Sequence, residues 1–589
     1  MCMKHSWDEP TLIFDQYRNG VGYKAAIGER GINGQTAVNE RFYVGDQWHG
    51  ARCGDRKPLV RYNVIKRIGD YKMAMVAGSA LAVNFTAEGV DSRTAAKERL
   101  AVIREAMSRG EAPVMTPEEQ VNLSLNVLSD YYRVTAERLG LDSLKNDALR
   151  RAFTSGTGVL YTWWDPTVRT GLYADEGRTS PITGDIRTEV LEVENLFFGD
   201  PTVEDVQQQP YIIIARRERV EELRREARRY GRSAEEVARI RPDREEAFAD
   251  GEELPDADKA TVLTKLYKQW NPTGNDWTIR AVRVVRGATV RGAWDMRIRR
   301  YPLAVFRWET RPHCAYGVSE VTYLVPNQIA INRAITASAN AVMMMGMPIL
   351  VVNEDVVAGP VTNDPGQIIP VNGGEDMGEC IRYVAPTNFT PQFEGLVNGM
   401  IANTLTQAGA NDAALGDMRP DNTSAIMAVR EAATMPMQLL QNRFYAFVEE
   451  IARIWAEFWV HLYGRRPLKV QDDTGEWYVP FDAAVLREQL INVRVDVGPA
   501  NLWSEIQSRQ TLDNLFTANL LTPLQYLERL PRGSVPDQTG LVRELREQTA
   551  GTPDSQQVVE ALSPDSREAL MQMDEDTRQR LLRQVLEQP

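Results

Sequence analysis

The sequence has 589 residues, of which 43% are hydrophobic and 25% are charged, and its formal net charge is -13 at pH 7. A chain of this length buries a large core and is expected to form more than one domain. The acidic balance argues against a generic nucleic-acid-binding protein, since such proteins usually carry a basic face. Four scattered cysteines fit a reducing compartment and argue against a zinc ribbon or a disulfide scaffold: Cys2, Cys53, Cys314 and Cys380. The N-terminus has no charged start followed by an apolar run, so no signal peptide is expected.

The first part of the chain predicts helices followed by strands. Residues 63–85 predict a helix that runs into a short strand, and residues 92–154 predict further helices. Thr116 and Glu119 form a capping-box pattern that marks the start of one of these helices. The pattern therefore predicts a helical layer before residue 155.

Strands dominate the stretch that follows. Residues 156–166 and 189–201 each predict a strand that ends in an Asp-Pro turn. Residues 261–310 predict alternating strands, with Gly274 and Asn275 as a hairpin turn. An antiparallel β layer beside helices gives an α+β fold class.

Residues 216–255 are dense in charges of both signs at helical spacing. Such a segment could be an arginine patch for phosphates. Glutamates alternate with the arginines, however, and this favours a solvated helix pair that carries ion pairs between residues three or four apart.

Residues 334–353 contain no charge, and four methionines fall within five positions of this stretch. A helix that spans a bilayer needs about 20 predominantly apolar residues. Here the first positions are mostly small or polar, and Pro348 begins a β-branched run. The sequence therefore predicts a helix that ends near Gly346 and then a strand, with no membrane span.

The stretch 318–462 predicts an ordered series of elements. A helix over about 322–346 is followed by the strands PILVV, GQIIPV and CIRYVAP, then by a helix over about 391–409, a loop, and a long helix from about Ser424 to Tyr463. The long helix carries an apolar stripe at spacings of three and four, which is typical of a core or subunit contact. Pro436 lies inside it and predicts a kink.

No motif of catalysis is found in the sequence. P-loop, HExxH and GxSxG patterns are absent, and the four histidines are far apart. Asp412 and Asp417 share one loop and could in principle hold Mg²⁺, but an ordinary exposed turn is the simpler interpretation. We therefore expect a structural protein that is not an enzyme and that binds no cofactor or metal.

Five stretches, in this order, carry a resemblance to a known family. They are RFYVGDQW followed by YNVIKRIGDYKMAMVAGSALAVNF, then SGTGVLYTWWDPTV, VENLFFGDPTVEDVQQQPYIIIARR, YPLAVFRWETRPHCAYGVSEVTYLVPNQIAINRAI and DNTSAIMAVREAATMPMQLLQNRF. Together they cover most of residues 40–530, and the chain resembles the portal (head–tail connector) proteins of tailed bacteriophages, of the podophage-like type. The charged insertion at 216–255 and the tail after 530 depart most from that family.

The resemblance implies a portal fold: a mixed α/β wing, a two-helix stem, a small α/β clip, a long kinked wing helix and a helical C-terminal crown. The implied ranges are wing 1–321, first stem helix 322–346, clip 347–388, second stem helix 389–409, tunnel loop 410–422, wing again 423–500 with the kinked helix and a hairpin, and crown 501–589.

The resemblance also implies roles for individual residues. The DNA-facing tunnel loop would contain Asn411, Asp412, Asp417, Met418 and Arg419. Subunits would meet along the first stem helix at Ala337, Asn340, Met343, Met344 and Met345. In that interpretation small residues let neighbouring helices approach, and the unbranched methionines suit a seam that tolerates small shifts.

The function implied is that of a ring, dodecameric by resemblance, at one capsid vertex of the virion. Double-stranded DNA would be packaged and ejected through its channel. The implied partners are the terminase large subunit, head–tail adaptor and tail proteins, and the major capsid and scaffolding proteins, with assembly in the host bacterial cytoplasm. The alternative left open is a metal-dependent DNA-processing enzyme, such as a nuclease, that uses scattered carboxylates.

Overall fold

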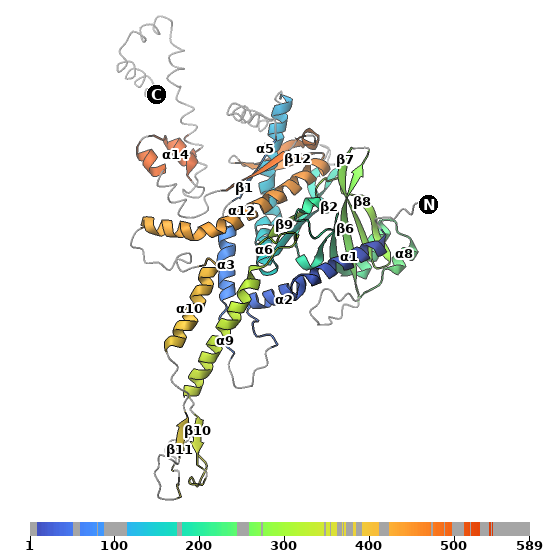
Figure 1. Ribbon diagram of the computed structural model, residues 1–589. Coiled ribbons are helices and arrows are strands. Elements are labelled where there is room, and N and C mark those ends of the chain that lie inside the picture. Colours follow the sequence, from blue (N-terminus) through green and yellow to red (C-terminus); the bar gives the residue numbers. More distant parts are fainter. Residues whose placement is uncertain are drawn as a thin grey trace, which may run out of the picture. The chain divides into compact units, whose positions relative to one another are not determined.

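The computed structural model describes most of the chain up to residue 530 (Figure 1). The described residues are 9–50, 59–78, 81–87, 115–173, 179–243, 258–272, 275–346, 349–353, 355–361, 368, 370–372, 381–384, 391–410, 423–472, 475–487, 489, 491–497, 512–518, 520–530, 541–542 and 545. The chain divides into two compact units, of which the first contains residues 1–471 and 476–496 and the second residues 472–475 and 497–589.

Helices and strands both contribute heavily, so the α+β fold class predicted from the sequence is confirmed. The longer helices are α1 (Pro10–Ala26), α2 (Gly31–Val44), α3 (Val64–Ala77), α5 (Pro117–Leu139), α6 (Leu141–Ser155), α7 (Val220–Arg229), α8 (Ala234–Arg239), α9 (Glu320–Gly346), α10 (Pro391–Gln407), α12 (Thr423–Leu462) and α14 (Pro523–Arg529). Short 3₁₀ turns are η1 (Val193–Asn195), η2 (Val206–Gln208) and η5 (Ala483–Leu486). The capping box of Thr116 and Glu119 forms as predicted at the start of α5.

The strands are β1 (Leu81–Ala87), β2 (Thr157–Tyr173), β3 (Pro181–Leu191), β4 (Leu196–Phe198), β5 (Tyr211–Arg219), β6 (Lys259–Asn271), β7 (Asp276–Val285), β8 (Ala288–Asp295), β9 (Leu303–Arg307), β10 (Ile349–Val352), β11 (Ile381–Val384), β12 (Arg465–Asp472), β13 (Gly475–Asp482) and β14 (Ile491–Val497). Strands β1 and β14, β10 and β11, and β12 and β13 form two-stranded pairs. The β12–β13 pair is the hairpin predicted in the range 423–500.

A five-stranded sheet in the order β4-β5-β6-β7-β8 is antiparallel throughout. Strand β5 is buried on both faces over residues 212–215, which explains its continuous apolar run. Ile213 and Leu263 face α1 in one core cluster, while Ile212 and Leu266 belong to the main core. Figure 1 shows α1 crossing this sheet. Strand β8 was not predicted as a separate element. Gly287, with φ 78°, turns the chain between β7 and β8.

The charged helices α7 and α8 cover the end of this sheet with a small apolar core that includes Leu223 and Ile240. Ion pairs of the predicted kind link Arg224 to Glu221 (3.6 Å) and Arg232 to Glu236 (3.7 Å). The prediction of a charge-laced helix pair is therefore confirmed for residues 220–239. The helical prediction was wrong for residues 216–219, which form the end of strand β5 and pair with β6, and residues 244–255 lie outside the described part of the chain.

A three-stranded sheet in the order β3-β2-β9 forms the second β layer. The prediction that Asp165-Pro166 ends strand β2 was wrong, because β2 continues to Tyr173 with a register shift after Asp165. Asp165 accepts hydrogen bonds from Thr167 N (2.9 Å) and Arg187 Nε (2.7 Å). A proline is tolerated at such an irregularity because no ladder hydrogen bond is needed there.

Three further predictions fall partly or wholly on undescribed residues. The first helix predicted within 92–154 and the helices of the tail after residue 545 lie outside the described part of the chain. Of the predicted strand GQIIPV, Val371 forms only an isolated bridge to Val357, and residues 366, 367 and 369 are not described. In the second unit, α14 begins with a capping box of Thr522 and Gln525.

Candidate functional site: the α9–α10 pair and helix α12

Helix α9 starts in the main core, where two glycines let the chain cross itself. A side chain at Gly156 or at Gly317 would collide with the backbone of the other. Just beyond this crossing, the Ser319 hydroxyl donates to Phe153 O (2.6 Å) and accepts from Val321 N (3.1 Å), which caps the helix. The first turn of α9 is thereby fixed to α6.

A buried ion pair secures the same end of α9. The Glu320 carboxylate accepts from Lys72 Nζ (2.5 Å) and from the indole of Trp308 (2.9 Å). Lys72 belongs to α3, so the pair joins α3 and α9. Buried charges are stable only when paired and hydrogen-bonded, as both are here.

Three polar side chains spaced four residues apart then hold α9 against the segment 59–65. Gln328 Oε1 accepts from the amides of Val64 (3.0 Å) and Ile65 (3.3 Å), and its Nε2 donates to Tyr62 O (2.6 Å). Asn332 Oδ1 accepts from Tyr62 N (3.0 Å) and from Gln328 Nε2 (2.9 Å). Together with Thr336 they form what we call the clasp: Gln328, Asn332 and Thr336.

Thr336 completes the clasp through the backbone of Val60, donating to its carbonyl (3.3 Å) and accepting from its amide (3.1 Å). Gln328 and Asn332 are almost fully buried, at 1% and 2% exposure. Buried amide side chains are expensive unless every polar atom is bonded. The clasp satisfies that condition and leaves the helix beyond Thr336 to extend from the core.

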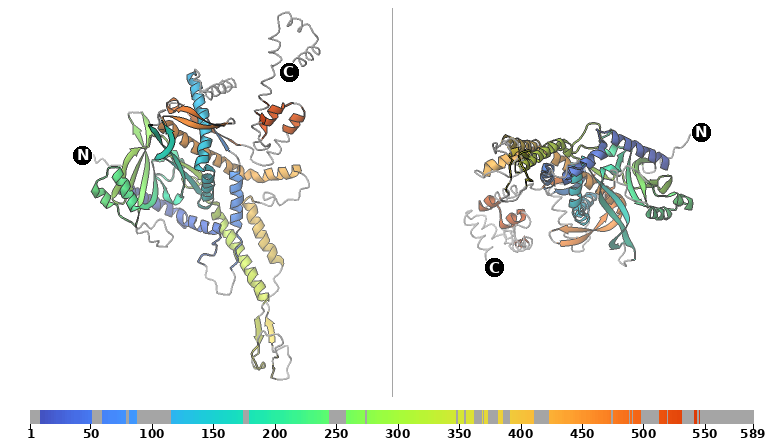
Figure 2. Two further views of the ribbon diagram at one scale, coloured as in Figure 1. Left: turned by 180° about the vertical axis from the view of Figure 1, so that it is seen from behind. Right: turned by 90° about the horizontal axis from the view of Figure 1, so that it is seen from below.

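The second half of α9 pairs with α10, and the β10–β11 ribbon joins the far ends of the two helices (Figures 1 and 2). The ribbon is antiparallel, with Ile349 opposite Val384 and Val352 opposite Ile381. The prediction for 334–353 is thus confirmed: the helix ends at Gly346 and a strand begins at Ile349. In the described part of the chain, no helix is both long enough and apolar enough to cross a bilayer.

The predicted stem contacts lie on this second half of α9. Ala337 is exposed, Asn340 is half-buried and Met343 is 48% exposed. Met344 and Met345 belong to α9, but their side chains are outside the described residues. The role of these residues as subunit contacts stays a prediction.

The predicted tunnel loop lies between α10 and α12. Asn411, Asp412, Asp417, Met418 and Arg419 all lie outside the described residues. The residues at its start are described: Ala408 and Ala410 are buried, at 5% and 0% exposure, and Ala410 N donates to Leu405 O (2.9 Å). The end of α10 is therefore anchored in the core.

Helix α12 is anchored by its C-terminal half. The predicted apolar stripe is buried, with Phe444 at 2%, Phe447 at 3% and Trp455 at 0% exposure. Phe306 of β9 packs against both phenylalanines, with ring centroids 5.8 Å apart in each case. The stripe is thus core within one copy, which is the first of the two roles that the sequence left open.

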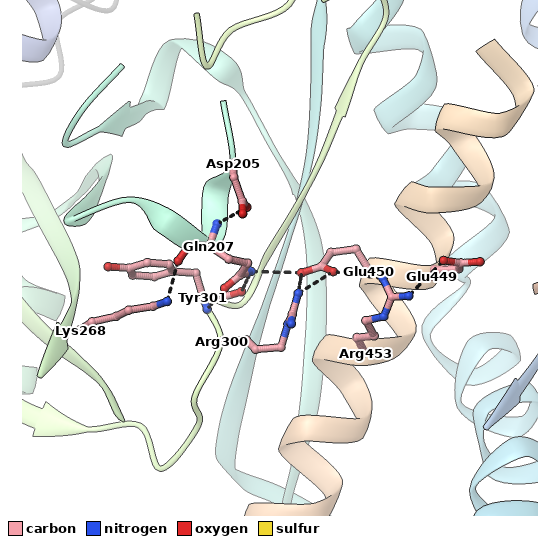
Figure 3. A network of polar contacts seen from close by, with 8 residues as sticks. All are labelled: Asp205, Gln207, Lys268, Arg300, Tyr301, Glu449, Glu450 and Arg453. Carbon is pink, nitrogen blue, oxygen red and sulfur yellow. Dashed lines mark hydrogen bonds and ion pairs between the residues drawn. The ribbon is translucent and has the colours of Figure 1, made fainter. Parts of the chain in front are cut away.

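A polar network fixes the same half of α12 to the two β layers (Figure 3). Glu450 accepts two hydrogen bonds from Arg300 (2.8 and 2.9 Å) and one from Gln207 Nε2 (3.1 Å). Gln207 also exchanges hydrogen bonds with the backbone of Tyr301 (2.9 and 3.1 Å), and Lys268 donates to Gln207 O (2.5 Å). This ion pair, in which Arg300 Nη2 contacts both carboxylate oxygens, and its neighbours set the position of α12 along the sheets.

A second buried network lies just after the end of α12. The Tyr463 hydroxyl donates to Asp185 Oδ1 (2.5 Å), and Arg138 forms an ion pair with the same carboxylate. Burial, together with the charge of the neighbouring Asp185, holds the pKa of Tyr463 well above its ordinary value. The hydroxyl therefore stays protonated and acts as a structural donor.

The first half of α12 exposes apolar side chains, unlike the second half, and the sequence did not predict this. Pro436 lies inside the helix, as predicted, and is exposed; its bend remains a prediction. Met435 and Leu439 are 59% and 65% exposed, whereas Met437 and Leu440 are buried. The sequence could have signalled this outward side only through the scarcity of charge around it.

Two surface crevices flank α2, with volumes of about 310 and 530 Å³. Their linings include Arg30 and Cys314 in the first and Glu40 and Glu194 in the second. Neither contains a residue that the sequence predicted for a functional site. Among the described residues, no three or more His, Cys, Asp or Glu side chains gather as a metal site would require.

Comparison with known proteins adds no family to this geometry: no protein-family model and no curated protein sequence matches the chain.

Proposed function

We propose that this chain is a portal subunit of a tailed bacteriophage, which assembles into a ring through which double-stranded DNA enters and leaves the capsid. The observation that carries the proposal is the order of elements from Glu320 to Leu462. Two neighbouring helices, joined at one end by a small β ribbon, are followed by residues 411–422 and by a 40-residue helix with an internal proline. A portal subunit needs this order to present a stem, a clip and a channel-facing loop.

The charge distribution supports the same proposal. The only charged residues in α9 are Glu320 and Arg333, and the only one in α10 is Glu394. Duplex DNA carries one negative charge per ~1.7 Å of axis, so a channel that lets it slide must avoid rows of lysine and arginine. Neutral helices beside a channel meet that requirement.

The proposed partners are the terminase large subunit and then head–tail adaptor proteins on the clip, and capsid and scaffolding proteins around the wing. The proposal assigns no chemical reaction to the chain. Its mechanism is geometric: a closed ring, a wall that does not grip phosphates, and a loop that touches the duplex.

The test is assembly without detergent or nucleotide. The purified 66.4 kDa chain should form rings of uniform size, visible by negative-stain microscopy and weighed by mass photometry. The proposal fails if the protein stays monomeric at high concentration. Cleavage of DNA that depends on a divalent metal would instead support the alternative of a DNA-processing enzyme.

A further inference from the structure

Lys24, in the last turn of α1, is buried at 2% exposure. Its Nζ donates to Val193 O (2.5 Å) and to Glu194 O (3.0 Å), both in the 3₁₀ turn η1. These two backbone carbonyls are its hydrogen-bond acceptors in the described part of the chain, and none of the described carboxylates forms an ion pair with it. We call this contact between α1 and η1 the latch: Lys24, Val193 and Glu194.

The face of α1 that carries Lys24 lies directly on Phe197 of β4. Tyr17 packs edge to face against that ring, with centroids 4.8 Å apart. A side chain added at Gly20 would collide with Phe197, at 2.9 Å. Lys24 Nζ lies 3.9 Å from the centroid of the same ring. Residues spaced in this way share one face of a helix, so the close contact between α1 and β4 continues to the last turn and ends at Lys24.

The contacts of Lys24 suit a neutral amine better than an ammonium group. A neutral amine has two N–H donors, and the two carbonyls of η1 accept both. An ammonium group has a third donor, and no described residue accepts it. The rings of Phe197 and Tyr316 (centroid 5.3 Å from Nζ) attract a cation, which offsets part of the cost of burial. Burial nevertheless lowers the pKa of Lys24 to about 7.

Glu194 is the titratable group that acts most directly on Lys24. Its negative charge favours the ammonium form, and burial raises the pKa of its own carboxyl. Tyr316 and Tyr23 stay protonated, since burial raises the pKa of both hydroxyls. Strand β4 contributes no titratable group. Other charged or titratable groups of the described residues on these elements are Cys314 before α9, Glu29 and Arg30 in the turn after α1, and Glu192 and Arg151, which pair with each other at 3.2 Å.

We propose that the latch is controlled by a proton: Lys24 holds the last turn of α1 on η1 as a neutral amine, and uptake of a proton loosens this contact. Opening carries the side chain into water, where the ammonium form is hydrated. The turn after α1 lines the smaller crevice beside α2, and η1 lines the larger one, so opening of the latch changes the walls of both. The latch lies within one copy of the chain and does not depend on the proposed ring.

The direction of the pH effect follows from the number of protons bound. A lysine in water has a pKa of about 10.4, so between about pH 7 and that value the open latch binds a proton that the closed latch lacks. The equilibrium constant for opening should therefore fall as the pH rises through this range. Below about pH 7 both states are protonated, and the constant should level off at its highest value.

The experiment is hydrogen exchange of the full-length protein, read by peptide mass spectrometry over a series of pH values. Exchange at each pH is divided by that of the unfolded chain at the same pH, which removes the intrinsic pH dependence. From about pH 7.5 to about pH 8.5, the opening constant of residues 20–31 and 190–197 should fall by about fivefold or more. From about pH 5.5 to about pH 6.5 it should change by less than about twofold. Peptides from residues 444–462 of α12 should show no such profile.

Three variants identify the group that titrates. Lys24→Met has no proton to exchange, so the pH dependence of both segments should vanish. Glu194→Gln removes the charge that favours the ammonium form, so the midpoint should move to lower pH. Lys66→Met is the matched control: Lys66 lies on α3, its side chain is 57% exposed, and it pairs with Asp70 at 4.0 Å. This control should keep the wild-type profile.

The proposal is overturned if exchange of the two segments does not depend on pH in the wild type. It is also overturned if every peptide follows the same profile, because the protein then opens globally and not at the latch. A wild-type profile in Lys24→Met would assign the titration to another group. If Lys24→Met does not fold, Glu194→Gln decides: a midpoint that moves to lower pH supports the latch, and an unmoved midpoint contradicts it.

Discussion

The clasp makes a specific prediction for Gln328→Met, a change that keeps the length of the side chain and removes its polar atoms. The variant loses the hydrogen bonds to Val64 N, Ile65 N and Tyr62 O, and the one to Asn332. Val64 N still donates to Tyr62 O (2.9 Å), and Asn332 Oδ1 still accepts from Tyr62 N (3.0 Å). Ile65 N is therefore the donor that loses its partner at the start of α3.

The expected loss follows from these contacts. A buried donor left without a partner costs about 1–3 kcal/mol, and each remaining lost hydrogen bond contributes about 0.5–1.5 kcal/mol. The lower limits of these four terms add up to about 2.5 kcal/mol, so Gln328→Met should lower the free energy of unfolding by about that much or more in urea denaturation. The same change should raise hydrogen exchange in residues 59–65, since these residues are held by the clasp. Gln407→Met, at an exposed position near the end of α10, is the control and should change stability by about 0.5 kcal/mol or less. A loss below about 1 kcal/mol with unchanged exchange would refute the claim that the clasp anchors α9.

Four more predictions address the channel and the body. Pro436→Ala should stabilise α12 locally, since proline costs about 3 kcal/mol relative to alanine inside a helix, yet impair assembly or DNA packaging in complementation assays; wild-type packaging would show that no bend is needed. Deleting residues 411–418 should leave rings intact by microscopy and reduce packaged DNA, whereas loss of assembly would make the loop a subunit contact. Purified rings should bind duplex DNA weakly, with a shallow salt dependence in filter binding. Tight binding that is lost when Arg225, Arg228 and Arg229 are replaced by Gln would contradict this. Burial lowers the pKa of Lys24 to about 7, so the unfolded chain binds more protons between that pH and about 10.5 and stability should rise with pH there; Lys24→Met should flatten this rise in urea denaturation between about pH 7.5 and about pH 9.5, and an unchanged slope would show that Lys24 is not its source.

Arg224 belongs to the same helix as Arg225, Arg228 and Arg229, but it is not replaced in the DNA-binding test, for a structural reason. Its guanidinium donates twice to Ile240 O (2.9 and 3.2 Å), which closes the end of α8. Replacing it would disturb the helix pair and confuse a binding measurement. The sequence alone offered no sign of this difference, because all the arginines of the segment have similar spacing.

Local signals in the sequence predicted much of the fold. The period of three and four residues around Phe444 and Trp455 identified the buried stripe of α12, and Pro348 separated helix from strand after Gly346. Both features are properties of a few adjacent residues. They survive in the fold because packing and local preference agree.

Features that depend on distant partners were not predictable in the same way. Strand β14 pairs with β1, which lies far earlier in the chain, and nothing near either strand identifies the other. Gln328 and Asn332 are polar residues on a helix, and their burial depends on the segment 59–65. The outward position of Leu439 depends on where the core ends, which periodicity does not show.

The clasp also restricts how α9 can move. Its three side chains bind fixed backbone groups of the 59–65 segment at one spacing along the helix. A shift of α9 by one residue in register combines a rise of about 1.5 Å with a turn of about 100°, and would direct these side chains away from their partners. A helix held in this way cannot slide by small, continuous steps. It either moves together with residues 59–65 as a rigid body or jumps by a full turn of ~5.4 Å. A movement of the α9–α10 pair should therefore be all-or-none.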